Sequence, residues 1–392
     1  MTASILLCPV CKESLQANES NKSLSCENNH SFDRARQGYL NLLLAHKKKS
    51  KNPGDSQEMV SARQAFLNSD FYRPISDSLN QIIADAALKL EQPIQVLDIG
   101  CGEGYYSQRM HNSLNEHKVE HKLYGLDISK DAVIAAAKRA KAEAALASKP
   151  VESEWLVASA VDIPLQAQSI DIATCLFTRL MPESYHKVIK QDGLFICVNT
   201  GEKHLIELRE KLYEEITKAE FDPVKNMGDD FELVDHQQVS YQNTLSSQQQ
   251  IQDLLLMTPH NWRTKADKKE ALASLEELTV TIDAQIHVFK AKEKAAVEVE
   301  VVEEVIETVS SSNPWGKAKV EADVSSPAIP ELPVEVVIEI PTEIITEIPA
   351  EIQTQSKAAS SISPWEKAPT EAKPTAKAEA ESKGSVNPWS KG

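Results

Sequence analysis

Three cysteines and one histidine in the first thirty residues have the spacing of a metal site. Two residues separate Cys8 from Cys11. Cys26 follows after fourteen more residues, and three residues separate it from His30. Thiolates and imidazole suit Zn²⁺, and four protein ligands leave no open position for a substrate, so such a site is structural. We therefore predict that these residues bind zinc; the alternative is three buried cysteines and a surface histidine that bind nothing.

A stretch of cations without any acid comes next, in residues 34–54. Its basic side chains are Arg34, Arg36, Lys47, Lys48, Lys49 and Lys51. Clustered cations in an acidic protein form a local positive surface that suits the phosphates of a nucleic acid. A solvated loop is the alternative, but the neighbouring zinc signature favours nucleic-acid binding.

A glycine-rich turn follows an apolar segment in the middle of the chain. Residues 95–104 read QVLDIGCGEG. Glycines let the backbone approach a ligand closely at the carboxyl end of a parallel strand. Asp98 and Glu103 would repel a pyrophosphate, whereas they suit a ligand with a cationic amino group and a sulfonium. A second predicted strand ends at Asp127, an acid that can bind ribose hydroxyls.

The elements that must position this turn alternate between strand and helix patterns. Strands are predicted over residues 95–99, 123–127, 154–158, 170–175, 194–199 and 279–289, and helices over 105–116 and 130–147. Strands that alternate with helices indicate an α/β fold with a doubly wound, mainly parallel sheet.

Composition limits the classes of protein that the chain can belong to. The 392 residues include 42 Lys and Arg and 58 Asp and Glu, a net charge of −16. Net acidity argues against indiscriminate nucleic-acid binding, but not against a local basic surface. No apolar run is long enough to span a membrane, and the N-terminus lacks a signal-peptide pattern. A cytoplasmic protein is therefore expected.

The last part of the chain, residues 291–392, differs in composition from the rest. It holds 10 of the 19 prolines, 18 acids against 10 basic residues, and no Cys, His, Phe or Tyr. Such a segment buries too little apolar surface to offset its ordering entropy, so we predict a disordered tail. A PWxK unit recurs around Trp315, Trp365 and Trp389. It is either a linear motif that binds a protein partner or a low-complexity repeat.

Taken together, the motifs resemble a known family. Residues 73–290 resemble S-adenosylmethionine-dependent class I methyltransferases, whose sheet has seven strands. Residues 5–290 resemble the bacterial large-subunit ribosomal RNA guanine-N1 methyltransferases. The similarity rests on CPVC and CENNHSFD near the N-terminus, GYLNLL at 38–43, NPGDS at 52–56 followed by Met59, Ala62 and Arg63, VLDIGCGEGYY at 96–106 and MTPHNWR at 257–263. The resemblance implies methyl transfer from S-adenosylmethionine to N1 of a guanine in a ribosomal RNA hairpin.

The resemblance also implies roles for individual residues. Asp98 would bind the amino group of the cofactor, and Asp127 its ribose. The other residues expected at the cofactor are Gly100, Gly102, Gly104, Tyr106, Ser159 and Ala160. One departure concerns the turn near the target base, where the family has an aromatic-x-Pro pattern and this chain has FTRL at 177–180.

The catalytic residues are less well defined. Guanine N1 must lose a proton, which requires a carboxylate, a histidine or water. Asp171, His204 and His260 are candidates, and Arg179 could stabilise a developing oxyanion, but a structural role is the alternative for each. No catalytic base is assigned from the sequence. Trp262 is expected in the core rather than stacked on a base.

The predicted organisation has four parts. They are a zinc-binding domain (1–35), a basic RNA-contacting linker (36–72), a methyltransferase domain (73–290) and a disordered acidic tail (291–392). The expected partners are ribosomal RNA and a protein that binds the PWxK units; a homodimer is left open, and no membrane contact is expected. Two other functions remain open: a methyltransferase acting on a small molecule or protein, and an RNA- or ribosome-associated adaptor whose tail recruits a partner.

Overall fold

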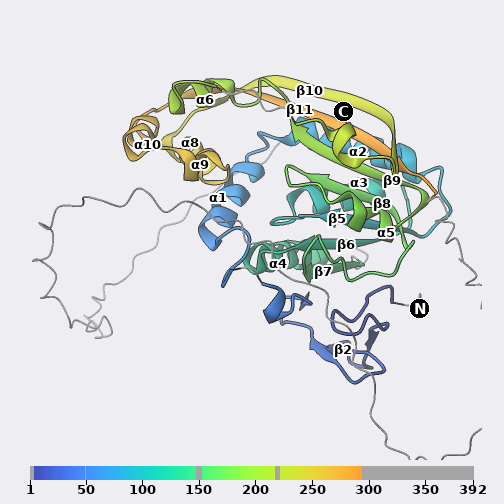
Figure 1. Ribbon diagram of the computed structural model, residues 1–392. Helices are drawn as coiled ribbons and strands as arrows, with labels where there is room; N and C mark the ends of the chain where they lie inside the picture. The colour runs from blue at the N-terminus through green and yellow to red at the C-terminus, as the bar shows by residue number, and fades with distance from the viewer. Residues whose placement is uncertain (1–3, 49, 147–151, 217–220, 294–392) are drawn as a thin grey trace, which may run out of the picture. The chain divides into compact units, whose positions relative to one another are not determined.

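The computed structural model describes residues 4–48, 50–146, 152–216 and 221–293 (Figure 1). These residues belong to one compact unit. The acidic tail with its PWxK units, predicted over 291–392, lies outside the described residues from 294 onward, as does Lys49. Within the described part, no helix is long and apolar enough to cross a membrane.

An eight-stranded sheet forms the centre of the unit, in the order β10-β11-β9-β8-β5-β6-β7-β4. The strands are β4 (Tyr39–Asn41), β5 (Ile94–Ile99), β6 (His121–Asp127), β7 (Ser153–Val157), β8 (Ile170–Leu176), β9 (Ile189–Thr200), β10 (Phe231–Leu245) and β11 (Leu278–Ala291). The first six are parallel to one another, whereas β11 is antiparallel to β9 and β10 is antiparallel to β11. The predicted doubly wound sheet is confirmed.

The sheet has one strand more than the seven predicted. The additional strand, β4, comes from the predicted linker and pairs in parallel with β7, with Leu40 opposite Leu156. Because β4 is only three residues long, it shows no periodic pattern from which it could have been predicted. The linker also contains α1 (Gln57–Asn68) and the short 3₁₀ helix η1 (Ala45–Lys47). The predicted domain boundaries at residues 35, 72 and 290 stay predictions.

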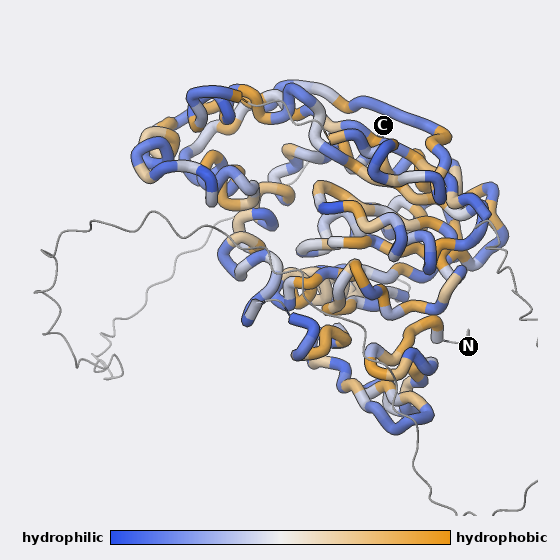
Figure 2. Tube along the Cα trace, in the orientation of Figure 1, coloured by the Kyte–Doolittle hydropathy of each residue, from blue (hydrophilic) through white to orange (hydrophobic). Residues whose placement is uncertain are grey.

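Burial along the strands explains their positions. All seven residues of β8 are buried, as expected for a central parallel strand that is covered on both faces. Neighbouring residues face different cores: Val96 and Ile172 pack in one, and Leu97 and Ala173 in the other. Most of β10 is exposed, so this polar strand is stable at the edge, and Figure 2 shows it mostly in blue.

Helices cover the two faces of the sheet. They are α2 (Arg73–Ala87), α3 (Tyr105–Glu116), α4 (Lys130–Leu146), α5 (Pro182–Val188), α6 (Ile206–Leu212), α7 (Pro223–Met227), α8 (Gln248–Leu256), α9 (His260–Arg263) and α10 (Ala266–Ala273). Helix α2 packs on α3, and α1 packs on both α4 and α8. In Figure 1, α1 therefore connects the sheet to a group formed by α6, α8, α9 and α10.

A small antiparallel sheet precedes the main one, with strands β1 (Gln16–Ala17), β2 (Ser23–Ser25) and β3 (Ser31–Asp33). We call residues 4–38 the ribbon. Its buried residues Leu6, Leu15 and Leu24 join the core cluster on one face of the main sheet. A bridge between Leu6 and Leu165 attaches the ribbon to the segment that follows β7. Figure 1 shows the ribbon, in dark blue, next to β7.

Candidate functional site

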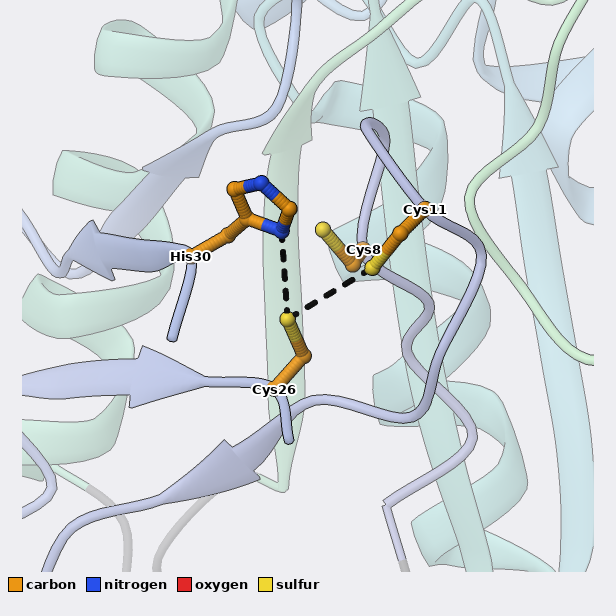
Figure 3. A group of neighbouring side chains, drawn as sticks. All are labelled: Cys8, Cys11, Cys26 and His30. Atoms are coloured by element: carbon orange, nitrogen blue, oxygen red, sulfur yellow. Dashed lines mark hydrogen bonds between the residues drawn. The ribbon is translucent and has the colours of Figure 1, made fainter. Parts of the chain in front are cut away.

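The four predicted metal ligands converge in the ribbon (Figure 3). Their ligand atoms all lie within 4.8 Å of one another. The Sγ atoms of Cys11 and Cys26 are 3.6 Å apart, and Cys26 Sγ lies 3.4 Å from His30 Nδ1. Zinc–sulfur bonds of about 2.3 Å in a tetrahedron place neighbouring ligands about 3.8 Å apart. The donor types and their separations therefore fit a zinc ion.

Two tight turns produce this arrangement. The N–H of Lys12 donates to Cys8 O at 2.9 Å, and the N–H of Asn29 donates to Cys26 O at 3.0 Å. Lys12 and Asn29 both have left-handed backbone conformations, with φ of 65° and 60°. A hydrogen bond from the Asn28 side chain lowers the pKa of the Cys11 thiol to about 6. This shift favours the thiolate, the form that binds metal.

Ion pairs attach the ribbon and η1 to β7 and to the segment that follows it, and they involve two of the predicted RNA-binding cations. Arg34 Nη1 lies 2.7 Å from Glu154 Oε2, and both side chains are only 15% exposed. Lys47 Nζ lies 2.7 Å from Asp162 Oδ2, and Lys12 pairs with the other oxygen of the same carboxylate. Arg34 and Lys47 thus contact the protein itself, which sequence reasoning did not foresee.

Three of the other predicted cations are exposed. Arg36, Lys48 and Lys51 are exposed, and none of them has an ion-pair partner among the residues that the structure describes. These three side chains are free to contact phosphates.

The glycine loop connects β5 to α3 and has a conformation that requires glycine. Gly100, Gly102 and Gly104 have φ of 74°, 55° and 84°, in the left-handed region. A Cβ atom on Gly104 would lie 2.9 Å from the Cβ of Ala136 on α4. The loop, which leads into α3, can therefore pack against α4 only if residue 104 has no side chain.

Two predicted cofactor carboxylates hold this loop in place. Asp127, at the end of β6, accepts hydrogen bonds from the N–H groups of Gly102 (3.0 Å) and Ser129 (2.8 Å). Asp98 is 1% exposed and accepts from the hydroxyls of Ser107 and Thr174. Burial raises the pKa of Asp98 to about 6. Asp98 therefore connects β5 to α3 and β8, and its direct contact with a ligand stays a prediction.

The remaining predicted cofactor residues lie beside the same edge of the sheet. Ser159 and Ala160 follow β7 and are half-buried. Tyr106 is half-buried in α3, and its hydroxyl is buried without a hydrogen-bond partner among the described residues. Strand β5 lies between β6 and β8, so the chain order reverses beside the glycine loop. Ligands of open α/β sheets bind at this switch point.

An aromatic cluster lies next to the loop and was not predicted. Phe177 follows β8, and its ring centroid lies 6.0 Å from that of Tyr72, 6.5 Å from Tyr106 and 6.1 Å from His204. Phe177 has a φ of 53°, which is strained for an aromatic residue and is typical of functional sites. It occupies the first position of the FTRL turn, where the resemblance placed residues near the target base.

The candidates for proton transfer occupy different environments. Asp171 is the second residue of β8, at the opposite end of the strand from the glycine loop, and accepts from Gln95 N–H and Lys190 Nζ, both at 2.7 Å. These contacts give it a structural role. Arg179 is exposed after β8. His260 is half-buried in α9, where its Nδ1 lies 2.9 Å from the Tyr213 hydroxyl.

His204 is buried beside the aromatic cluster. Its Nδ1 accepts from the N–H of Asp283 at 3.2 Å, and its Nε2 lies 3.0 Å from the Tyr72 hydroxyl. Burial lowers the pKa of His204 to about 4, so the ring is neutral at pH 7. With both nitrogens bonded, His204 is suited to position Tyr72 and poorly suited to accept a proton.

Sequence reasoning also missed or misplaced several side chains. Arg139 of α4 pairs with Glu103 of the loop, with Nε 3.1 Å from Oε2, and Glu103 is 1% exposed. Arg63 of α1 lies over Gly102; the motif that begins with NPGDS contains this arginine, but no role was predicted for it. Trp262 is 68% exposed, so its expected core position was wrong.

Comparison with known proteins identifies the chain. A zinc-ribbon family model described as "RlmA, N-terminal" matches residues 6–51, and a "Methyltransferase domain" model matches residues 96–191. The 23S rRNA (guanine(748)-N(1))-methyltransferase of Streptomyces fradiae is 34% identical over 207 residues, covering 53% of this chain and 67% of that protein. The putative 23S rRNA (guanine-N(1)-)-methyltransferase YxjB of Bacillus subtilis (strain 168) is 29% identical over 291 residues, covering 72% and 96%. The putative 23S rRNA (guanine-N(1)-)-methyltransferase of Micromonospora griseorubida is 27% identical over 299 residues, covering 72% and 95%.

The fold, the glycine loop and these matches define a class I S-adenosylmethionine-dependent methyltransferase with an N-terminal zinc ribbon. Within this class, the chain belongs to the family of 23S ribosomal RNA guanine-N1 methyltransferases.

Proposed function

We propose that this protein transfers a methyl group from S-adenosylmethionine to N1 of a guanine in a hairpin of large-subunit ribosomal RNA. One observation carries the proposal beyond family membership. The ribbon with Arg36, and the segment after β4 with Lys48 and Lys51, are joined through β4 and the Arg34–Glu154 ion pair to the same sheet whose carboxyl edge bears the glycine loop. An RNA bound at these cations would therefore have a fixed position relative to the glycine loop.

The glycine loop, Asp98, Tyr106, Asp127, Ser159 and Ala160 form the proposed cofactor site. S-adenosylmethionine supplies a sulfonium methyl group that is already activated, so the protein must mainly align the reactants. Asp127 and Asp98 hold the loop through bonds to Gly102, Ser107 and Thr174. We further propose that Cys8, Cys11, Cys26 and His30 bind a structural zinc ion that keeps the ribbon folded.

The target base must leave its stack before it can react, because N1 carries a proton within a Watson–Crick pair. Phe177 and Tyr106 are placed beside the loop, where an aromatic ring can stack on an extruded base. Since the Nδ1 of His204 accepts a hydrogen bond, the ring proton is on Nε2 and is donated to the Tyr72 oxygen. In this proposal His204 and Tyr72 shape the base pocket, and solvent accepts the N1 proton.

The RNA surface is proposed to include Arg36, Lys48 and Lys51 of the N-terminal region. Trp262 adds a second contact, because an indole that is 68% exposed can stack on an unpaired base. It lies next to Arg263 and near Lys265, which are both exposed. This combination of an aromatic ring and cations is typical of surfaces that bind single-stranded RNA.

The function is tested by incubating the protein with labelled S-adenosylmethionine and purified 23S or 16S ribosomal RNA. We expect 1-methylguanosine, identified by mass spectrometry of the digested nucleosides, in 23S RNA alone. Label in small molecules or proteins would show a different substrate class. Cofactor binding without transfer to any RNA would instead favour the adaptor function.

A further inference from the structure

The proposed cofactor site is rich in acids and has few cations. Asp98, Glu103 and Asp127 all lie on or beside the glycine loop. The methionine end of S-adenosylmethionine carries an ammonium group, which suits these acids. It also carries a carboxylate, which must be held by a cation or by N–H groups.

One arginine near the loop is already committed to the protein. The Nε and Nη2 atoms of Arg139 both donate to Glu103 Oε2, and Nη2 also donates to Asn68 Oδ1 at 2.9 Å. The side chain of Arg139 is 17% exposed. It therefore balances the buried charge of Glu103 and is not placed for a ligand.

A second arginine, Arg63, lies over the loop with free donors. Its Cδ atom is 3.8 Å from where a Cβ on Gly102 would lie. Its Nη2 donates to Asp55 Oδ2 at 2.7 Å and to Met257 O at 3.0 Å. A guanidinium has five N–H donors, and Nε and Nη1 of Arg63 have no hydrogen-bond partner among the described residues.

The segment before α1 fixes the position of Arg63. The main-chain oxygen of Asp55 accepts from the Ser129 hydroxyl at 2.7 Å, just after β6. Gly54 packs so closely on Ser129 that a Cβ would lie 2.7 Å from the serine Cβ. Asp55 and Met257 then orient the guanidinium by accepting hydrogen bonds from its Nη2, so little ordering is left to be done when a ligand binds.

The charge of Arg63 reaches the acids of the loop. Burial raises the pKa values of both Asp127 and Glu103, and the Arg63 guanidinium opposes this shift in each case. The cation thus lies within electrostatic range of the two residues that border the loop.

We infer that Arg63 binds the α-carboxylate of S-adenosylmethionine, through the N–H groups of Nε and Nη1. This inference rests on the proposed function and assigns a residue that the glycine-loop motif does not contain. The NPGDS motif then has a definite task, which is to hold a carboxylate-binding arginine above the loop.

The test compares S-adenosylmethionine with its decarboxylated form, which keeps the adenosine, the sulfonium and the amine. Dissociation constants of both ligands are measured by calorimetry for the full-length protein and for Arg63→Gln. We expect Arg63→Gln to weaken binding of S-adenosylmethionine by roughly 10- to 100-fold, the effect of losing a charge-assisted hydrogen bond. Binding of the decarboxylated form should change by less than about threefold.

Two further variants separate ligand binding from a structural role. Arg63→Lys keeps the charge without the fork, and we expect it to retain part of the preference for the carboxylate. Arg73→Gln removes an exposed arginine of α2 that pairs with Asp70 and Asp77, and it should leave both affinities unchanged.

Equal losses for both ligands in Arg63→Gln would show that Arg63 only holds α1 in place, and would overturn the inference. A wild-type protein that binds both ligands equally well would also overturn it, while leaving the cofactor assignment intact. A wild-type protein that binds neither ligand would overturn the proposed function and this inference with it.

Discussion

The ribbon and the glycine loop are both ligand sites, but they are built in opposite ways. The four predicted zinc ligands lie within residues 8–30, on two turns of a segment whose strands are two or three residues long. The loop and the adjoining end of β5 are held by side chains from α3, α4, β6 and β8. The ribbon has little core of its own, whereas the loop is part of a sheet with two large cores.

This difference indicates what each site depends on. A segment with little core needs its metal to fold, so loss of one ligand should unfold the ribbon locally. A loop within a large core should survive the loss of one contact, and only its ligand binding should change. Loss of zinc binding should therefore leave cofactor binding intact, and loss of cofactor binding should leave the zinc site intact.

The largest effect is expected from Gly104→Ala. The new Cβ would lie 2.9 Å from Ala136 Cβ, so the loop must move and cofactor binding should fall by roughly 100-fold. Calorimetry with S-adenosylmethionine measures this. Gly38→Ala is the matched control, because Gly38 also has a positive φ, of 105°, but has nothing within 4 Å of its Cβ position. Equal affinities of the two variants would contradict the steric requirement at the loop.

Next in size is the effect of Cys26→Ser. Loss of one ligand should remove the zinc, measured by elemental analysis, and lower methyl transfer to RNA by about 10- to 100-fold. Cofactor affinity should change by less than about threefold, because the loop does not depend on the ribbon. Cys197→Ser, in the buried part of β9, should keep its zinc. Parallel loss of cofactor affinity in Cys26→Ser would show that the sites are coupled.

A smaller effect concerns pH and Asp98. Burial raises the pKa of this carboxyl from 3.8 to about 6, so the folded state binds its proton more tightly than the unfolded state does. Its contribution to stability is complete below about pH 4 and is lost as the pH rises through 6. Between pH 7 and 5 the wild type should gain about 1 kcal/mol relative to Asp98→Asn.

Denaturant unfolding of both proteins at the two pH values measures this difference. Cofactor affinity should change in the opposite direction and weaken below about pH 6. The ionised Asp98 carboxylate stabilises the loop and attracts the ammonium group of the cofactor, and protonation removes both effects. An identical pH dependence of stability in the two proteins would argue against a buried, ionisable Asp98.

The smallest effect is expected at the surface cations. The double variant Lys48→Ala and Lys51→Ala should weaken RNA binding by about threefold and reduce its salt dependence, since each lost phosphate contact lowers the slope by about 0.7 to 0.9. Arg34→Ala should instead lower the melting temperature by a few degrees, because Glu154 would lose its partner in a site that is 15% exposed. RNA binding is measured by filter binding and stability by thermal melts. Weaker RNA binding in Arg34→Ala, with a lower melting temperature in the double lysine variant, would contradict both assignments.

Local and long-range features differed in how well the sequence predicted them. The cluster of Cys8, Cys11, Cys26 and His30 could be predicted because its ligands lie close together in the chain. The same is true of the glycine loop, whose strand, turn and helix are consecutive. The hydrogen bonds around the loop join residues up to 76 positions apart, as between Thr174 and Asp98. Such long-range contacts cannot be predicted from a local sequence pattern.

Two further differences have physical causes. The sequence predicted Arg34 as an RNA contact, whereas the folded chain pairs it with Glu154 of β7. A basic stretch alone does not reveal which acid will lie opposite it. Trp262 was expected in the core because tryptophan usually buries a large area, but α9 is only four residues long and leaves its ring exposed.

The most direct test of the central claim is to locate the modified base. Purified 23S ribosomal RNA is incubated with the full-length protein and S-adenosylmethionine, and reverse transcription is used to map stops, because a methyl group on N1 blocks Watson–Crick pairing. We predict one strong stop at an unpaired or loop guanine, absent with Gly104→Ala and weakened with Cys26→Ser. No stop in 23S RNA, with methyl transfer to a small molecule or a protein, would contradict the proposed function.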